Sequence, residues 1–224
     1  MHPKEGYKLR SGERVPSVTT ITGRFKDSGP LIKWANNMGL QGLDCYSVRD
    51  KAADAGTVCH NMCELYINKL PVESALEGID QETATKAKNA FEQYKVWQKQ
   101  SKIKIVMTEV QMVSEEYGFG GCFDAIGFVN GKHCLIDFKT SNGLYPDYLY
   151  QISAYGNLVE YGEVMATRKP LDIVINGGYH LLKFSKEEGD FSHHFFQDLT
   201  EAFIGFKLMV RLYEIDKTMK NRAK

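Results

Sequence analysis

The sequence of 224 residues lacks any apolar run near the roughly 18 residues that a membrane-spanning helix needs. Its first 16 residues, MHPKEGYKLRSGERVP, are polar and contain no signal-peptide core. These two absences predict a cytoplasmic protein that has no membrane partner.

A second pair of absences concerns cofactors. No G-x-x-x-x-G-K-[ST] phosphate-binding loop occurs, so we expect no nucleotide cofactor and no nucleotide-driven motor. The five cysteines are an odd number and form no disulfide-like framework, so we expect partly buried thiols. Cys59, His60 and Cys63 have no second Cys/His pair at finger-like spacing, which argues against a structural zinc site.

Net charge is also absent, because 28 Lys and Arg balance 28 Asp and Glu. The charges are unevenly distributed, however. Residues 1–33 contain seven basic and three acidic side chains, residues 203–224 contain six and two, and the middle of the chain is acidic. Basic ends around an acidic centre suit an enzyme whose carboxylates bind metal while flanking cations bind phosphates, although solvated termini would have the same composition.

The chain does contain a regular succession of helix and strand patterns. With 43% hydrophobic residues it can bury one large core, and we expect residues 1–224 to form one domain, helical at about 15–100 and with a sheet core at about 103–184. Helix patterns fall at about 31–38, 47–70, 81–100, 146–161 and 195–213; strand or extended patterns fall at 15–22, 103–113, 123–129, 133–139, 171–175 and 178–184. This order predicts an α/β (α+β) fold with a central mixed sheet flanked by helices.

The stretch GGCFDAIGFVNGKHCLIDFKTS concentrates the candidate chemistry. Asn130-Gly131 is a strong hairpin-turn signal between two runs rich in Phe, Ile, Val and Leu. Because side chains alternate along a strand, Asp137 and Lys139 share one face and their apolar neighbours the other. Asp124 on the preceding strand would complete a cluster. Two bare carboxylates so close would repel, and one would keep its proton near neutral pH unless a divalent cation lay between them.

The same three residues allow a plainer interpretation. The Asp-x-Lys pattern could be an exposed strand face that carries a surface ion pair, which contributes at most about 1 kcal/mol. The choice between the two interpretations depends on the rest of the chain.

His60 is a candidate on an expected helix, with Gly56 one turn earlier on the same face. A glycine inside a helix costs roughly 1 kcal/mol relative to alanine, so we expect another helix or a substrate to approach closely there. Taken alone, a helical histidine is more typical of a surface or core position.

Gln151 and Tyr155 are four residues apart on a later helix and project to one side of it. In one interpretation Tyr155 is core and Gln151 is exposed. In the other, Gln151 orients Lys139 or a phosphate and Tyr155 holds a water or the scissile group. Glu109 is either an edge-strand charge or a carboxylate that supports the site.

Five motifs follow one another in a familiar order: Gly56-xxx-His60, Glu109, Gly121-xx-Asp124, Asp137-Phe-Lys139 and Gln151-xxx-Tyr155. Together they resemble the motif series of the PD-(D/E)XK nuclease superfamily, specifically its RecB-like exonuclease branch. Residues 16–19 and 31–34 also resemble the N-terminal region of small phage-type and mitochondrial genome maintenance exonucleases. The resemblance covers about residues 15–160, implies a restriction-endonuclease-like core, and favours a site over the exposed-face interpretation.

The resemblance implies a role for each candidate residue. A divalent metal, Mg²⁺ or Mn²⁺, would be held by His60, Asp124, Asp137 and the main-chain carbonyl of Phe138. The catalytic residues would be Asp124, Asp137, Lys139, Gln151, Tyr155 and Glu109, and the DNA contacts would be Ser17, Lys33, Tyr145, Tyr148 and Tyr150. An imidazole ligand suits Mn²⁺ at least as well as Mg²⁺. No cysteine follows Cys134, so we expect no iron–sulfur cluster of the kind that some members of the branch carry.

By the same resemblance, the chain would be a metal-dependent DNA exonuclease that releases 5′-phosphate products from single-stranded or resected ends. It would serve phage or mobile-element recombination, replication or repair, in the host cytoplasm if phage-encoded, with a recombinase or single-strand-binding protein as a candidate partner. Two alternatives stay open. One is a duplex-specific exonuclease or an endonuclease on the same fold, and the other is a non-catalytic nucleic-acid-binding module.

Overall fold

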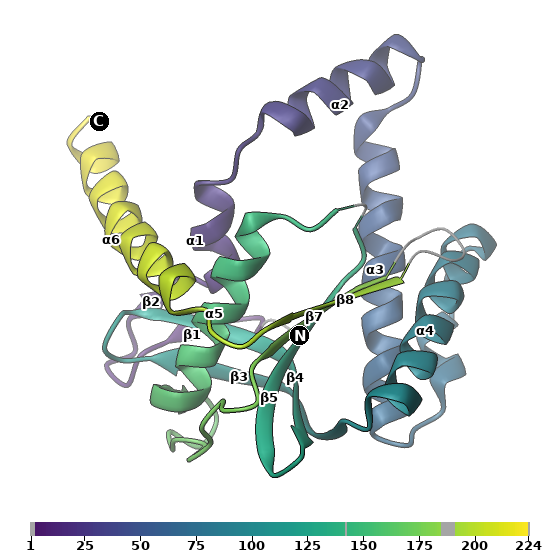
Figure 1. The fold of residues 1–224 in the computed structure, drawn as a ribbon. Helices are drawn as coiled ribbons and strands as arrows, with labels where there is room; N and C mark the ends of the chain where they lie inside the picture. The colour runs from purple at the N-terminus through teal and green to yellow at the C-terminus, as the bar shows by residue number, and fades with distance from the viewer. Residues whose placement is uncertain (1–2, 142, 185–190, 224) are drawn as a thin grey trace.

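The computed structural model describes residues 3–141, 143–184 and 191–223 (Figure 1). The helices are α1 Val18–Arg24, α2 Gly29–Leu40, α3 Cys45–Ile67, α4 Gln81–Ser101, α5 Pro146–Tyr161 and α6 Thr200–Arg222, with a 3-10 helix at Val72–Leu76. The strands are β1 Tyr7–Lys8, β2 Arg14–Val15, β3 Lys104–Ser114, β4 Phe119–Val129, β5 Lys132–Lys139, β6 Glu163–Val164, β7 Tyr179–Phe184 and β8 Phe191–Phe196. Over these described ranges, no helix is long and apolar enough to cross a membrane.

A six-stranded mixed sheet organises the molecule. Its strand order is β6-β3-β4-β5-β7-β8, and β1 pairs separately with β2. β3, β4 and β5 are antiparallel neighbours, whereas β7 lies parallel to β5 after the crossover through α5. Helices flank this sheet (Figure 1), so the expected mixed α/β fold is confirmed.

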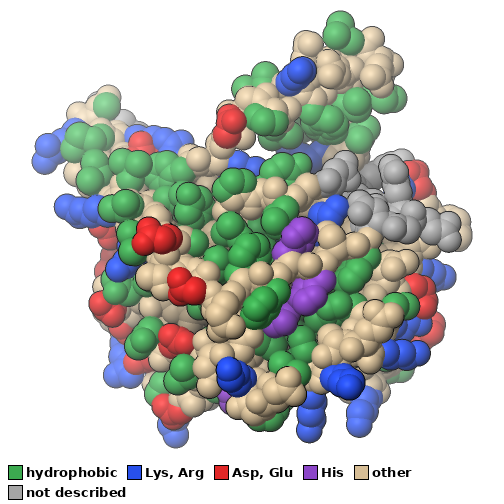
Figure 2. Space-filling model, viewed as in Figure 1, with side chains coloured by type: hydrophobic (Ala, Val, Ile, Leu, Met, Phe, Trp, Pro, Cys, Tyr) green, Lys and Arg blue, Asp and Glu red, His purple; other side chains and the backbone are tan. Residues whose placement is uncertain are grey.

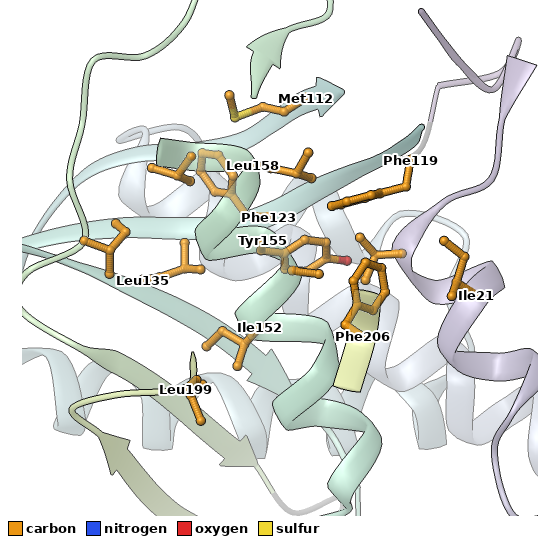
Figure 3. Close-up of a cluster of buried hydrophobic side chains, with 14 of the residues drawn as sticks. Ile21, Met112, Phe119, Phe123, Leu135, Ile152, Tyr155, Leu158, Leu199 and Phe206 are labelled. Atoms are coloured by element: carbon orange, nitrogen blue, oxygen red, sulfur yellow. The ribbon is translucent and has the colours of Figure 1, made fainter. Parts of the chain in front are cut away.

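One face of the sheet packs against α1, α5 and α6 (Figure 3). The sheet contributes buried aromatic and aliphatic side chains, and the three helices cover them. Residues at the centre of this cluster are Phe119, Phe123 and Leu135 of the sheet, Ile21 of α1, Ile152, Tyr155 and Leu158 of α5, and Phe206 of α6.

The opposite face packs against α3 and α4. Its cluster contains Cys59 and Cys63 of α3, Phe91, Tyr94 and Trp97 of α4, and Ile136, Phe138, Leu182 and Phe184 of the sheet. The central strands therefore have apolar layers on both sides. No disulfide joins any of the five cysteines, all of which lie in the described ranges, and four of them are buried, as expected.

The β4–β5 hairpin forms as the sequence predicts. Asn130 and Gly131 have φ angles of 51° and 78°, the left-handed conformation that this tight turn requires. Ile136 and Phe138 enter the α3–α4 cluster, and Asp137 projects from the other face of β5.

The expected strand or extended segment at 15–22 is wrong beyond Val15, because α1 begins at Val18. The Ser17 side chain accepts a hydrogen bond from the backbone N–H of Thr20 and caps the helix. Val18 and Ile21, three residues apart, are fully buried. Capping and burial therefore outweigh the β propensity of this β-branched segment.

Two further boundaries differ from expectation near the C-terminus. The described residues 171–175 form no strand: Leu171 and Ile173 pack inward, but the backbone N–H of Ile175 donates to the Glu160 side chain. The expected helix at 195–213 begins later, at Thr200, because residues 191–196 form β8 along the edge of β7. In both places the local apolar pattern predicted the wrong secondary structure, because contacts with distant segments decide it.

His180 of β7 and His193 of β8 form a stacked pair beside α4. The Nδ1 atom of His180 lies 2.8 Å from Nε2 of His193, and the ring centroids are 5.0 Å apart. Burial lowers the pKa of His180 to about 4, and the adjacent His193 adds to this effect. The folded protein therefore keeps His180 neutral well below the pH at which an unfolded histidine becomes charged.

We predict that the free energy of unfolding decreases as the pH is lowered from about 6.5 to about 4. In this window the unfolded chain binds a proton at residue 180 and the folded chain does not, so acid favours unfolding, by up to about 3 kcal/mol from this residue. Urea unfolding at several pH values measures the slope. His180→Phe should flatten it, and the matched control His133→Phe should not; equal slopes for both variants would contradict the assignment.

Candidate functional site

Three segments that are distant in the sequence meet where α3 contacts the sheet. The imidazole of His60 donates from Nε2 to the carbonyl oxygen of Phe138, at 3.1 Å. The backbone N–H of Phe138 donates to Asp124 Oδ2, at 2.7 Å. The His60 Nδ1 and Asp124 Oδ1 atoms are 4.0 Å apart, which leaves room for a cation between them. α3, β4 and β5 thus bring together three of the expected metal ligands.

Asp137 is the most buried charged group of this cluster. Its side chain is 1% exposed, and Oδ2 lies 2.5 Å from Lys139 Nζ. Apart from this ion pair, neither carboxylate oxygen has a hydrogen-bond partner among the residues that the structure describes. A buried carboxylate so poorly satisfied is costly, and a bound cation would relieve the cost.

The charges of the cluster shift one another's pKa values. Burial raises the pKa of Asp137 to about 7; the ammonium group of Lys139 opposes this rise, and the charge of Asp124 adds to it. Burial alone would lower the pKa of Lys139, but the charges of Asp137 and Asp124 raise it. Burial is therefore the main cause of the raised pKa of Asp137, and the carboxylate repulsion expected from the sequence only adds to it.

A cavity of about 380 Å³ opens in front of these groups. It is lined by Thr19, Thr57, His60, Asn61, Glu64, Glu109, Cys122, Asp124, Lys139, Gln151 and Tyr155. A second hollow of about 280 Å³ shares Thr57, His60 and Lys139 with the first. Lys139 therefore borders both spaces, whereas the buried Asp137 lines neither of them.

Glu109 of β3 lies opposite Asp124 of β4, because the strand register pairs Thr108 with Ala125 and Val110 with Phe123. Its φ angle of 51° is unusual for a non-glycine residue inside a strand and stores strain of about 1–3 kcal/mol. The Cys122 thiol donates to Glu109 Oε2 at 3.2 Å. This distorted backbone lies beside the cavity, where strain often has a functional origin.

α5 closes the cavity from the opposite side. Gln151 Nε2 donates to the Tyr155 hydroxyl oxygen at 2.9 Å. A Cβ atom on Gly121 would lie 2.7 Å from the Tyr155 ring, so only glycine lets α5 pack this close to β4. Burial, followed by the charges of Asp137 and Asp124, raises the pKa of Tyr155 well above its usual range and keeps it a neutral donor.

The predicted DNA contacts divide into two groups. Tyr148 lines the second hollow, and its ring lies 5.1 Å from Lys139 Nζ. Tyr145 packs edge-to-face on Tyr148, with centroids 5.5 Å apart. Tyr150 instead packs against α6, where a Cβ on Gly205 would lie 2.8 Å from its ring.

Ser17 and Lys33 line neither cavity. The Ser17 hydroxyl caps α1, although the next residue but one, Thr19, does reach the site. Lys33 is exposed on α2, which has no buried residue and stands away from the body with the first turns of α3 (Figures 1 and 2).

Five lining residues were not identified as site candidates from the sequence: Thr19, Thr57, Asn61, Glu64 and Cys122. Glu64 adds a carboxylate to the same wall as His60, since it lies four residues later on α3. That spacing was the signal available in the sequence. Thr19 lies on a segment whose helical structure was not expected, so its position could not be inferred.

The donor atoms fit a hard divalent cation. Within the described part of the chain, no three His, Cys, Asp or Glu side chains already stand in the geometry of a metal site. Even so, the carboxylates of Asp124 and Asp137, the carbonyl of Phe138 and the His60 ring offer mainly oxygen donors, as Mg²⁺ and Mn²⁺ prefer. The poorly satisfied carboxylate of Asp137 is the specific feature that such a cation would explain.

Comparisons with protein-family models and with curated proteins found no match. Among solved structures, the crystal structure of SSO0001 shares 17% sequence identity with this chain, at a TM-score of 0.38. The similarity covers 75% of this chain and 74% of that one. Likeness at this level carries no argument about function.

Gly56 marks the closest approach of α3 to the end of β5. A Cβ atom at this position would lie 2.3 Å from Thr140 Oγ1. The close approach that the mid-helix glycine predicted is confirmed, but the approaching group is the Thr140 side chain that follows β5, not another helix or a substrate as expected.

We predict that Gly56→Ala lowers the free energy of unfolding by about 1–3 kcal/mol, because the added methyl group overlaps Thr140 Oγ1 and either this side chain or α3 must shift. The double variant Gly56→Ala/Thr140→Ala should recover most of the loss in urea unfolding, since it removes the clashing oxygen. Gly39→Ala is the matched control, because an added Cβ on this α2 glycine meets nothing within 4 Å. Failure of the double variant to recover stability would refute the proposed contact.

Proposed function

We propose that this chain is a metal-dependent DNA exonuclease of the PD-(D/E)XK type, similar to the RecB-like branch. It would hydrolyse phosphodiester bonds to 5′-phosphate products on single-stranded or resected DNA ends. Phage or mobile-element recombination, replication or repair is the setting that the resemblance implies, with a recombinase or single-strand-binding protein as a candidate partner.

One observation carries this proposal. His60, Asp124 and Lys139 come from three separate segments and line one cavity, and the carboxylate of Asp137 is buried directly behind it, beside Lys139. An exposed-face ion pair would not require this burial, which costs free energy unless the carboxylate has a task. Strongly shifted carboxylates beside a cavity are typical of active sites.

Asp124, Asp137, the Phe138 carbonyl and His60 would hold Mg²⁺ or Mn²⁺. When bound, such a cation neutralises the anionic phosphodiester and acidifies water at the site. The protein prepares this position in advance, because the backbone N–H of Phe138 fixes the Asp124 carboxylate through a 2.7 Å hydrogen bond. The same residue presents its carbonyl oxygen toward His60.

Lys139 is the group placed to meet the reacting phosphate. Its ammonium borders both hollows, and the charges of Asp137 and Asp124 keep its pKa raised despite burial. A fixed positive charge can orient the attacking water and stabilise the negative charge that develops as the phosphorus is attacked. Tyr155, held by Gln151, supplies a neutral hydroxyl to the same space.

Two tyrosines beside the site support a single-stranded substrate. Tyr145 and Tyr148 lie edge-to-face, and Lys26 Nζ is 5.3 Å and 5.9 Å from their ring centroids. Aromatic rings contribute about 1–3 kcal/mol for each stacked base, and a lysine nearby attracts the phosphate backbone. Tyr148 lines the second hollow beside Lys139, and Tyr145 packs on Tyr148.

We predict that Asp137→Ala and Lys139→Ala each reduce the rate of Mg²⁺- or Mn²⁺-dependent hydrolysis by about 10²–10³-fold or more, since the first removes a ligand of the cation and the second removes a positive charge that stabilises the transition state. A linear oligonucleotide with a fluorescent end label provides the assay. Lys132→Ala, at the exposed hairpin, is the matched control and should keep full activity.

Measuring DNA binding alongside hydrolysis distinguishes this enzyme from a module that only binds DNA. Lys139→Ala should still bind labelled oligonucleotide while losing hydrolysis. If the wild-type protein binds DNA and no divalent metal supports cleavage, the non-catalytic alternative is correct.

The state of the DNA substrate is a separate prediction. We expect single-stranded linear DNA to be degraded faster than matched duplex, and covalently closed circles to be resistant, because an exonuclease requires an end. Mononucleotide and short products carrying a 5′-phosphate should appear on denaturing gels or by mass spectrometry. Cleavage of closed circles would favour the endonuclease alternative, and a preference for duplex would favour the duplex-specific exonuclease.

A further inference from the structure

α6 carries apolar side chains on two opposite faces. One face packs against the core through Phe203, Phe206 and Val210. The other exposes Ile204, Leu208, Leu212, Ile215 and Met219, each between 41% and 68% accessible. We call these five residues the outer stripe. Their spacing of four, four, three and four residues keeps them on one side of the helix over about four turns, roughly 22 Å.

A surface helix normally presents polar residues to solvent, so an outer stripe of this length marks a contact surface. α6 projects from the body toward the C-terminus (Figure 1), and hydrophobic side chains lie among Lys and Arg in this part of the space-filling view (Figure 2). Nothing else in the described chain covers the stripe, since all five side chains are exposed.

We propose that the outer stripe pairs with the same stripe of a second copy of this chain, with the two α6 helices antiparallel. The spacing of the five stripe residues is nearly the same when α6 is read from its C-terminal end. About a two-fold axis near Leu212, Ile204 faces the partner's Met219, Leu208 faces the partner's Ile215, and Leu212 faces the partner's Leu212. A self-complementary surface of this kind is what a two-fold dimer requires.

The area is sufficient for a dimer. The stripe presents on the order of 500 Å² per protomer, a size typical of interaction sites on protein surfaces. Pairing two stripes buries on the order of 1,000 Å², the lower bound for a specific interface. This predicts a dimer of moderate affinity that forms independently of DNA and of catalysis.

Sedimentation velocity of the full chain over about 1 to 100 µM tests the proposal. The mass should rise from 25.4 kDa toward twice that value with concentration. Leu208→Asp and Leu212→Asp should each weaken association at least tenfold, and circular dichroism should show an unchanged fold because both side chains are exposed. Val174→Asp, at an equally exposed apolar residue outside α6, is the matched control and should associate like the wild type.

Oxidative cross-linking tests the antiparallel register. Leu212→Cys, next to the proposed axis, should form a disulfide-linked dimer, whereas Leu208→Cys should not, because its two copies lie roughly 10 Å apart along the axis. The wild type, with its native cysteines, sets the background. A monomer at every concentration overturns the proposal. A dimer that persists in both Asp variants of α6 also overturns it. So does a dimer that is dissociated by Leu40→Asp on α2 and not by the α6 variants.

Discussion

The burial of the Asp137 carboxylate beside Lys139 is the constraint on which the site depends. β5 runs through the middle of the sheet, between β4 and β7, with an apolar layer on each side. Placed there, Asp137 is cut off from water and has one ammonium group as its charged partner at 2.5 Å. Such an arrangement is unfavourable for stability alone, because removing a carboxylate from water costs several kcal/mol. The surrounding elements hold it in place.

Close packing from both sides keeps the site narrow. α3 reaches the end of β5 because residue 56 is glycine, and α5 reaches β4 because residue 121 is glycine. α3 carries His60 to the site, and α5 carries Tyr155. The strands supply the fixed carboxylates, and the two helices bring an imidazole and a phenol hydroxyl group to them. Each side chain is thus positioned by a rigid element, which is what preorganised electrostatic chemistry requires.

The periphery follows a different rule from the centre. α6 joins the core through one face and exposes an apolar stripe on the other, and α2 has no buried residue at all. The core-facing positions of α6 stabilise the fold, whereas the outer stripe contributes nothing to an isolated chain. Contact with a second copy of the chain would explain why the outer stripe is apolar, and it would leave the candidate active site unchanged.

Local patterns were sufficient for the hairpin and for most helices. Asn130-Gly131 requires left-handed backbone, and alternation along β5 separates Asp137 from Ile136 and Phe138 whatever the surroundings. Residues 15–22 and β8 were assigned wrongly, because a cap, burial and the edge of β7 decided between competing local preferences. Tyr150, which the sequence predicted to contact DNA, packs against α6. Glu64 lines the cavity although it was not identified from the sequence.

The sequence by itself determined which residues share a face of one helix or strand, because backbone geometry repeats every 3.6 or every two residues. It therefore indicated Asp137 with Lys139, and Gln151 with Tyr155, as pairs. Only the tertiary structure decided what faces each pair, how deeply Asp137 is buried and that Glu109 adopts a strained backbone beside Asp124. Burial and long-range contact arise from elements far apart in the chain, and no local periodicity encodes their distances.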